Sequence, residues 1–226
     1  MIDKTVRSIA EAMAGIQDGA TVLIGGFGGV GEPVALIDGL IEQGATNLTL
    51  VSNTCGRAGC GIARLLELGR VRKMIVSWTR SNPPGPFGQL YQDGKVELEL
   101  VPQGTLAQRM QAAGAGMPAF FTATAVGTPL AKGKEHRRIA GRTYVLEEAI
   151  HGDVGLIEAW QADRWGNLTY RRAGRNFNPV MAMAAHLTIA QAQHIVRLGE
   201  IDPDHIVTPG IFVNRVLHVP YGDPPF

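Results

Sequence analysis

The sequence predicts an open α/β fold, in which a mainly parallel sheet carries helices on both faces and one loop or hairpin insertion lies over the sheet. Three observations predict it. Short continuous apolar runs alternate with amphipathic helical segments, the pattern of β-α-β units on a parallel sheet. The pattern loosens between residues 126 and 150, which predicts the insertion. Finally, 226 residues with 45% hydrophobic content and no linker or repeat predict a single domain spanning residues 1–226.

The first half of the chain alternates helices and strands. Asp3 is a candidate N-cap for a first helix, because apolar residues from Val6 to Ile16 recur at helical spacing. A second helix is expected to begin at Glu32 and Pro33, since proline is tolerated in a first helical turn. The expected strands are residues 21–24, 48–51, 71–76 and 96–101. The other expected helices are residues 62–68 and a turn at 87–91.

The second half mixes strands with irregular segments. Thr105 is expected to cap a helix over residues 106–113, followed by a strand at 119–122. Gly166 and Asn167 accept positive φ, so residues 162–167 are predicted to form a hairpin turn between strands at 154–160 and 168–170. The remaining expected elements are a helix at 181–185, strands at 187–189, 194–196 and 211–213, and an irregular tail at 220–226.

The glycine-rich loop after the strand at residues 21–24 is the most informative segment. Gly26, Gly28 and Gly31 spell G-x-G-x-x-G, which is typical of dinucleotide binding. Pro33 argues against that interpretation, because a dinucleotide-binding fold needs its helix already under way at this position. The strand at residues 48–51 also lacks the following acidic residue that would hold a ribose. A nicotinamide-dependent oxidoreductase is therefore only a remote alternative.

Composition excludes several classes of function. Lys and Arg total 21 against 20 Asp and Glu, so we expect no nucleic-acid partner. No apolar run reaches the ~18–20 residues of a membrane span, and no signal peptide precedes the first strand. Two cysteines and six scattered histidines lack metal-ligand spacing, so no metal site is expected. We expect a cytoplasmic protein without membrane contact.

Polar side chains follow the strands that should end at one edge of the sheet. They are Asn53, Asn82 and Gln103, together with Ser52 and Ser77. In open α/β sheets, ligands bind outside the carboxyl ends of the strands. Such amide and hydroxyl donors can steady an oxyanion, but they include no obvious nucleophile, and plain turn residues would look the same. The adjacent pair of residues 147 and 148 is expected to be surface-exposed.

A series of motifs adds a family resemblance. The chain resembles the α, or A, subunits of the family I 3-oxoacid coenzyme A transferases, and among them most resembles those acting on 3-oxoadipate. The motifs follow the family order from about residue 2 to residue 215. They are D-G-x-x-V-L-I-G-G-F-x-x-x-G-x-P at 18–33, V-P-Q-G-T-L at 101–106, G-M-P-A-F-F at 116–121, Y-V-L-E-E at 144–148, D-R-W-G-N-L-T-Y at 163–170, R-N-F-N at 175–178, M-A-M-A at 181–184 and I-V-T-P-G-I-F-V at 206–213.

The resemblance implies a function and a partner. It implies transfer of CoA from succinyl-CoA to a 3-oxo acid, with the CoA thioester as substrate and no tightly bound cofactor. The catalytic glutamate lies in a Ser-Glu-Asn-Gly motif of the family's β, or B, subunit, and that motif is absent here. We therefore expect a heterodimer or heterotetramer whose nucleophile comes from the partner, through a glutamyl-CoA thioester.

The same resemblance assigns roles to residues of this chain. Gln103 matches the family's side-chain amide donor to the oxyanion, and Asn53 matches an asparagine near the site. Asn82 is expected to join Asn53 in binding substrate. The glycine loop matches the segment usually assigned to CoA, although turn geometry alone would also favour glycine. Its expected CoA-binding residues are Gly25, Gly26, Phe27, Gly28, Gly29, Val30 and Gly31.

Departures from the family pattern leave the acceptor open. Thr54 replaces a second asparagine, Ala125 replaces a glycine, and Gly174 replaces an alanine. The nearest alternative keeps the class of enzyme but changes the acceptor to acetoacetate or a short-chain fatty acid. An alternative from another class is a non-catalytic, CoA-responsive binding module.

Overall fold

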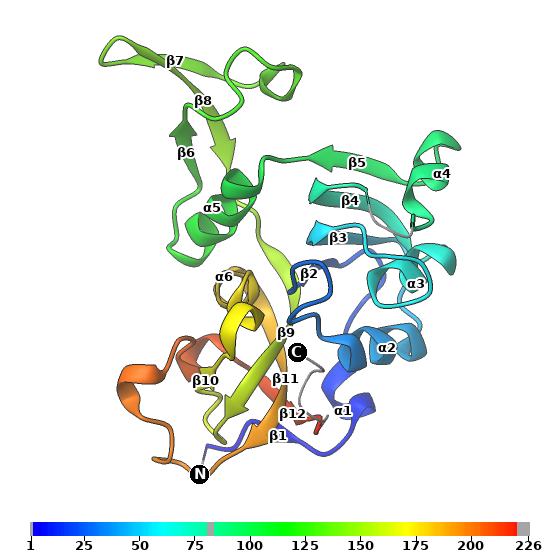
Figure 1. Ribbon diagram of the computed structural model, residues 1–226, viewed down its shortest axis with the longest axis vertical. Helices are drawn as coiled ribbons and strands as arrows, with labels where there is room; N and C mark the ends of the chain where they lie inside the picture. Colours follow the sequence, from blue (N-terminus) through cyan, green and yellow to red (C-terminus); the bar gives the residue numbers. More distant parts are fainter. Residues whose placement is uncertain (1, 81–83, 221–226) are drawn as a thin grey trace.

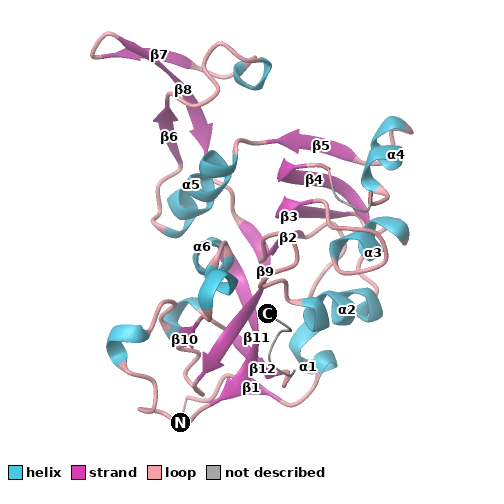
Figure 2. Ribbon diagram, viewed as in Figure 1, coloured by secondary structure: helices cyan, strands magenta, loops and turns pink. Residues whose placement is uncertain are grey.

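The computed structural model describes residues 2–80 and 84–220, and its main feature is one large twisted sheet (Figures 1 and 2). Within these residues the parallel part of the sheet has eight strands. Their spatial order is β1 (Thr5–Val6), β12 (Arg215–His218), β11 (Ala185–Ile195), β9 (Gly152–Ala162), β2 (Thr21–Ile24), β3 (Leu48–Thr54), β4 (Val71–Trp78) and β5 (Glu97–Leu100). A ninth strand, β10 (Leu168–Thr169), pairs antiparallel with β9.

Helices cover both faces of this sheet, as predicted. One face packs against α1 (Ile9–Met13), α2 (Val34–Gln43), α3 (Ile62–Glu67) and α4 (Phe87–Gln92). The other face packs against α5 (Gln103–Gly114) and α6 (Asn178–Ala184). Alternate residues of each strand serve the two cores: Val22 and Ile24 belong to the first, and Leu23 to the second. This alternation follows from the two-residue repeat of a strand and explains why the parallel strands read as unbroken apolar runs.

The predicted insertion is a small second sheet that projects beside α5 (Figure 1). Its three described strands are antiparallel, in the order β6 (Ala119–Thr122), β8 (Arg142–Glu148) and β7 (His136–Ile139). The 3₁₀ turn η1 (Pro129–Ala131) lies between β6 and β7. Three further short 3₁₀ turns are η2 (Arg172–Arg175), η3 (Pro203–His205) and η4 (Gly210–Phe212).

Two expected N-cap residues are wrong. Asp3 does not cap a helix: its carboxylate accepts hydrogen bonds from the Thr5 amide and hydroxyl in the turn before β1. Ser8 caps α1 instead, by accepting a hydrogen bond from the Glu11 amide. Helix α5 begins at Gln103 and not after Thr105, because Pro102 has a helix-compatible φ of −54° and its carbonyl accepts the first helical hydrogen bond.

Two expected strands near the C-terminal end of the chain also differ. Residues 187–189 and 194–196 are not separate strands but are joined in β11, because Gln191 and Gln193 are buried within the strand and interrupt only its apolar pattern. Residues 211–213 are not a strand. Pro209 begins the η4 turn there, and its carbonyl accepts a hydrogen bond from the Phe212 amide. The tail expected at 220–226 lies almost wholly outside the described residues.

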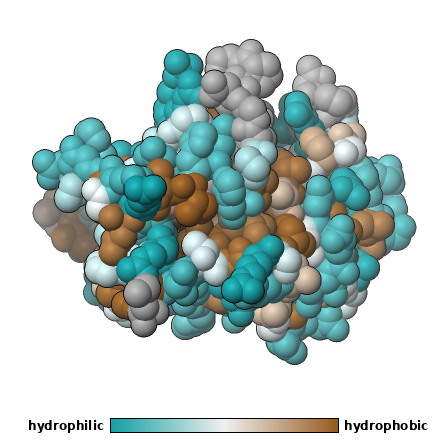
Figure 3. Space-filling model, turned by 90° about the horizontal axis from the view of Figure 1, so that it is seen from below, coloured by the Kyte–Doolittle hydropathy of each residue, from teal (hydrophilic) through white to brown (hydrophobic). Residues whose placement is uncertain are grey.

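On the face seen from below, apolar residues gather in the middle among mostly hydrophilic ones (Figure 3). Apolar side chains are also exposed at the carboxyl ends of the central strands: Phe27 is 50% and Trp78 59% exposed. No helix among the described residues is long and apolar enough to cross a membrane.

Candidate active site

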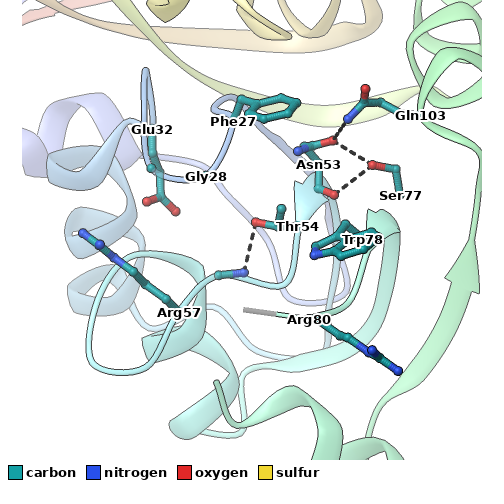
Figure 4. A pocket seen from close by; sticks show the side chains of 12 residues that line it. Phe27, Gly28, Glu32, Asn53, Thr54, Arg57, Ser77, Trp78, Arg80 and Gln103 are labelled. Carbon is teal, nitrogen blue, oxygen red and sulfur yellow. Dashed lines mark hydrogen bonds between the residues drawn. The ribbon is translucent and has the colours of Figure 1, made fainter. Parts of the chain in front are cut away.

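A pocket of about 560 Å³ lies at the carboxyl ends of β2 to β5 (Figure 4). The four strands are neighbours and run parallel, so the loops that follow them meet at one edge, as the sequence predicts. The residues that line the pocket come from these loops and strand ends. They are Phe27, Gly28, Gly29, Glu32, Asn53, Thr54, Gly56, Arg57, Ser77, Trp78, Arg80 and Gln103.

Three neutral polar side chains form a cluster on one side of the pocket (Figure 4). Asn53 is the centre: its Oδ1 accepts hydrogen bonds from Gln103 Nε2 at 2.8 Å and from Ser77 Oγ at 2.7 Å. Strand register brings Asn53 beside Ser77, because Ser52 pairs with Val76 and Thr54 with Trp78. Gln103 joins them from the first turn of α5. Two of the three predicted site amides are thus in direct contact.

This cluster orients amide hydrogens for a ligand. Since Asn53 Oδ1 accepts both hydrogen bonds, the Asn53 Nδ2 group keeps its two hydrogens, and it has no partner among the described residues. Asn53 is only 3% exposed, so its orientation is fixed by the cluster. Gln103 Nε2 also keeps a second hydrogen, at the start of the 12-residue helix α5. A helix N-terminus and neutral amide donors both favour negative charge on a nearby oxygen.

The glycine loop is a tight hairpin. Phe27 and Val30 exchange two backbone hydrogen bonds, at 3.0 and 3.1 Å. Gly28 and Gly29 form the turn with φ of 61° and 98°, the positive values that a two-residue type I′ turn requires. The amides of Phe27 and Val30 are therefore already engaged within the hairpin, whereas Gly28 and Gly29 line the pocket.

Two asparagines hold the hairpin in place: Asn178 is the first residue of α6, and Asn176 lies in the segment just before that helix. Asn178 is fully buried, and its Nδ2 donates to Gly31 O at 3.1 Å. Asn176 accepts from the Gly26 amide at 3.0 Å and donates to Val30 O at 3.0 Å. Their close approach also explains Gly25 on packing grounds, because a Cβ there would lie 1.8 Å from Asn178 Oδ1.

These asparagines were not predicted to have a role, although they stand in the R-N-F-N motif at residues 175–178. The sequence signal that could have indicated their role is the pair of amide side chains at i and i+2 within this family motif. Glycine at residues 25 and 31 is thus required by contact with protein atoms: a Cβ on Gly31 would lie 2.6 Å from Gly174 O.

The other side of the pocket is charged. Glu32, next to the hairpin, accepts a hydrogen bond from the Ile62 amide at 3.4 Å, and Arg57 lies close enough for its charge to act on that carboxylate. Burial raises the pKa of Glu32, and the Ile62 hydrogen bond and the Arg57 charge only partly oppose this shift. Arg80 also lines the pocket. Arg80 belongs to the loop after β4 that the sequence places at this edge, whereas no sequence pattern indicated a function for Glu32 or Arg57.

Potential nucleophiles are scarce among the described lining residues. Glu32 is their only carboxylate, and it faces the start of α3. Nearby Cys55 is 2% exposed, and burial raises the pKa of its thiol to about 12, so it is not a thiolate at neutral pH. The described residues also contain no group of three His, Cys, Asp or Glu that could hold a metal ion.

Glu147 corrects one expectation about the surface, while Asn82 stays a prediction. Glu147 is expected at the surface, but it is 2% exposed. The cost of burying its charge is offset by two cations, Lys134 at 2.5 Å and Arg109 at 3.9 Å. Asn82 lies outside the described residues, so its predicted place in the site is untested.

Comparison with known proteins places this geometry in a family. The coenzyme A transferase family matches residues 6–218. The chain is 57% identical to the A subunit of 3-oxoadipate CoA-transferase from Pseudomonas putida, over 97% of this chain and 95% of that protein. It is 51% identical to the A subunit of a probable succinyl-CoA:3-ketoacid coenzyme A transferase from Bacillus subtilis, over 95% of this chain and 89% of that protein.

A solved structure shares the fold. An acyl-CoA transferase of Escherichia coli, crystallised as a thioester complex with CoA, superposes with a TM-score of 0.83 at 24% identity. The match covers 98% of this chain but 48% of that one, so this chain spans about half of its length. The family match covers nearly all residues, and it agrees with the high identity to the two bacterial relatives. This chain belongs to the coenzyme A transferase family.

Proposed function

We propose that the chain is the A subunit of a two-subunit CoA-transferase that moves CoA from succinyl-CoA to a 3-oxo acid, with 3-oxoadipate as acceptor. The observation that carries this proposal is the 57% identity to the corresponding chain of a 3-oxoadipate CoA-transferase over almost the whole sequence. The pocket supports it, because Asn53 and Gln103 offer neutral donors of the kind that an acyl-transfer oxyanion needs.

The proposed chemistry needs a carboxylate nucleophile. A glutamate of the B subunit, as nucleophile, attacks the succinyl-CoA carbonyl and expels the CoA thiolate, which leaves a mixed anhydride. The thiolate then attacks the glutamyl carbonyl of that anhydride and expels succinate, which leaves a glutamyl-CoA thioester. The acceptor carboxylate then attacks the glutamyl-CoA thioester and expels the CoA thiolate, which leaves a second mixed anhydride. The thiolate attacks the acceptor's carbonyl in that anhydride, which forms the acceptor's CoA thioester and frees the glutamate. Each attack places negative charge on a carbonyl oxygen, and we assign the Asn53 and Gln103 amides to stabilise it.

Features of the pocket support a nucleophile from a partner chain. The lining residue with a carboxylate, Glu32, uses it to accept the Ile62 amide hydrogen bond. Ser77 Oγ donates to Asn53, and it has no hydrogen bond to a histidine, lysine or carboxylate among the described residues. Phe27, Val30 and Trp78 leave apolar surface exposed near the pocket. A B subunit in a heterodimer or heterotetramer would cover this edge and complete the site.

The remaining expectations follow from the same proposal. CoA enters as a thioester substrate, and no tightly bound cofactor takes part. The turn amides of Gly28 and Gly29 are the part of the hairpin left to contact CoA, because those of Phe27 and Val30 are engaged. A cytoplasmic location fits the two free cysteines, which persist in reducing compartments.

The proposal is tested by assembling the enzyme. A purified B subunit, the purified chain described here and their mixture are assayed with succinyl-CoA and 3-oxoadipate. We expect turnover only in the mixture, together with a glutamyl-CoA thioester that borohydride reduces on the partner chain. Robust turnover by the isolated chain would refute a shared site, and a mixture that forms a complex but transfers no CoA would refute the reaction.

The role of Gln103 is tested in the same complex. Gln103→Ala removes an amide donor and is expected to lower kcat by about 10²–10³, with a smaller change in KM. Gln111→Ala, in the last turn of the same helix and exposed, is the matched control and should leave kcat unchanged. Equal kcat for wild type and Gln103→Ala would remove Gln103 from the oxyanion role.

A second acceptor class is favoured by one observation, the 51% identity to a protein named for 3-ketoacids in general. Acetoacetate and a short-chain fatty acid therefore compete with 3-oxoadipate in the same assay. A higher kcat/KM for acetoacetate would keep the enzyme class and change the acceptor.

A further inference from the structure

The pocket has two chemically different ends. One end holds the neutral cluster of Asn53, Ser77 and Gln103, where the reacting carbonyl is placed by the proposed function. The other end holds Glu32 and Arg57, and Figure 4 shows these two side chains on the opposite side of the pocket from the amides. A ligand that fills the pocket therefore meets neutral donors at its reacting end and a charged pair at the far end.

Arg57 has guanidinium donors that can bind an anion. Its Nε donates to Cys60 Sγ at 3.4 Å, which fixes the near part of the side chain. Its terminal guanidinium nitrogens donate no hydrogen bond among the described residues. Figure 4 shows the guanidinium directed towards Glu32, yet that carboxylate is bonded to the Ile62 amide. The planar fork of Arg57 thus remains available for a bidentate carboxylate.

Glu32 is a weak competitor of a ligand carboxylate for the Arg57 guanidinium. The carboxyl is packed against Gly61, where an added Cβ would lie 2.4 Å from Glu32 Oε1. Burial also disfavours its ionised form. A ligand carboxylate that is free to turn can reach better hydrogen-bond geometry on the guanidinium than Glu32 does.

We propose that Arg57 is a specificity-determining residue that binds the distal carboxylate of dicarboxylic acyl groups. This proposal rests on the proposed function and deepens it. Succinyl and 3-oxoadipyl groups both carry a second carboxylate at the end remote from the reacting carbonyl, whereas acetoacetyl and short fatty acyl groups carry none. The two-ended pocket therefore offers a cation, Arg57, on the side away from the amides that hold the reacting carbonyl.

Arg80 is the other cation among the described lining residues. Figure 4 shows its side chain directed away from the amide cluster and away from Glu32. Under the proposal, a substrate whose reacting carbonyl is held by the amides extends across the pocket to the side that holds Glu32 and Arg57. The proposal therefore assigns the binding of the distal carboxylate to Arg57.

The test compares two acceptors of equal length in the assembled two-subunit enzyme. 3-Oxoadipate carries the distal carboxylate, and 3-oxohexanoate has a methyl group in its place. In a ping-pong reaction, kcat/KM for the acceptor reports only the second half-reaction, so the shared donor does not affect the comparison. The measured quantity is the ratio of kcat/KM for 3-oxoadipate to that for 3-oxohexanoate.

Arg57→Gln is expected to lower this ratio roughly 10- to 100-fold, as for the loss of a charged hydrogen-bond pair. Arg57→Lys keeps the charge without the fork and should give an intermediate ratio. Arg72→Gln is the control, because Arg72 is exposed at the opposite end of β4. A wild-type ratio in Arg57→Gln overturns the proposal for Arg57, whereas no transfer to either acid by the wild-type complex overturns the proposed function itself.

Discussion

At the scale of single residues, Glu32 is a partly buried carboxyl group in the pocket, and its burial makes stability depend on pH. Its carboxyl is held between the glycine hairpin and the start of α3, where it accepts the Ile62 amide. Burial raises its pKa above the ordinary value of 4.5. The folded protein therefore binds this proton more tightly than the unfolded chain does. Its contribution to stability is present below pH 4.5 and is lost as the pH rises through the raised pKa.

Replacing Glu32 with glutamine removes the charge of the side chain while keeping its size and shape. Glu32→Gln keeps an oxygen that can accept from Ile62 but stays neutral at every pH. Relative to wild type, the variant's free energy of unfolding is expected to increase from pH 4 to pH 7, because only wild type must bury an ionised carboxyl. Urea unfolding at several pH values measures this difference. Glu42→Gln, an exposed position on α2, serves as control. A pH-independent difference for Glu32→Gln would contradict the burial argument.

Residue roles were predictable where a side chain follows a strand. Asn53 and Gln103 were predicted at the rim and do meet, because the carboxyl ends of parallel strands share an edge. Arg57 and Glu32 were missed because loop charges usually face water, and sequence does not show which loop folds back over the pocket. Asn178 was missed as a support because its partner Gly31 lies 147 residues away along the chain.

At the scale of elements, the apolar runs predicted where the strands lie more accurately than they predicted where each strand begins and ends. Strands β3 and β4 extend past the predicted Val51 and Val76, into polar residues that line the pocket. The ladder there is maintained by backbone pairing, which an apolar pattern cannot report. Helix α5 also begins earlier than predicted, and this places Gln103 in its first turn. The boundary errors thus fall on the residues that make the site, where polar groups replace the core pattern.

The glycine hairpin is the clearest element-scale difference. Its letters match a dinucleotide motif, yet Phe27 and Val30 pair to form a hairpin, and α2 begins only at Val34. A dinucleotide fold would place these glycines against the helix N-terminus. Here the hairpin ends before the helix and stands over the pocket. Pro33 was the local signal for this outcome, since it precedes the helix as its N-cap residue.

At the scale of the whole molecule, the small sheet is joined to the rest of the protein by a partly buried ion cluster. Glu147 on β8 pairs with Lys134 at 2.5 Å and lies 3.9 Å from Arg109 on α5. Arg109 in turn pairs with Glu99 on β5 at 2.6 Å. The cluster thus links the projecting sheet, the helix that begins with Gln103, and the edge of the main sheet (Figure 1).

Removing the central carboxylate should loosen the small sheet alone. Glu147→Ala leaves Lys134 and Arg109 without their buried partner, a loss that costs roughly 3–5 kcal/mol when a pair is fully buried. The cost should fall below this range, since the Lys134 side chain is 30% exposed and Arg109 keeps its pair with Glu99. We expect amide hydrogen exchange at least tenfold faster in β6 and β8, with β2 and β3 unchanged.

The neighbouring exposed carboxylate provides the control for that prediction. Glu148→Ala changes a side chain on the opposite face of β8 and keeps the backbone oxygen that accepts from Arg109. Its exchange pattern should match wild type. If Glu147→Ala instead accelerates exchange equally in β6 and β2, the small sheet does not open separately from the main sheet. A local effect would mean that the ion cluster stabilises the small sheet on α5 while the main sheet and its pocket keep their own stability.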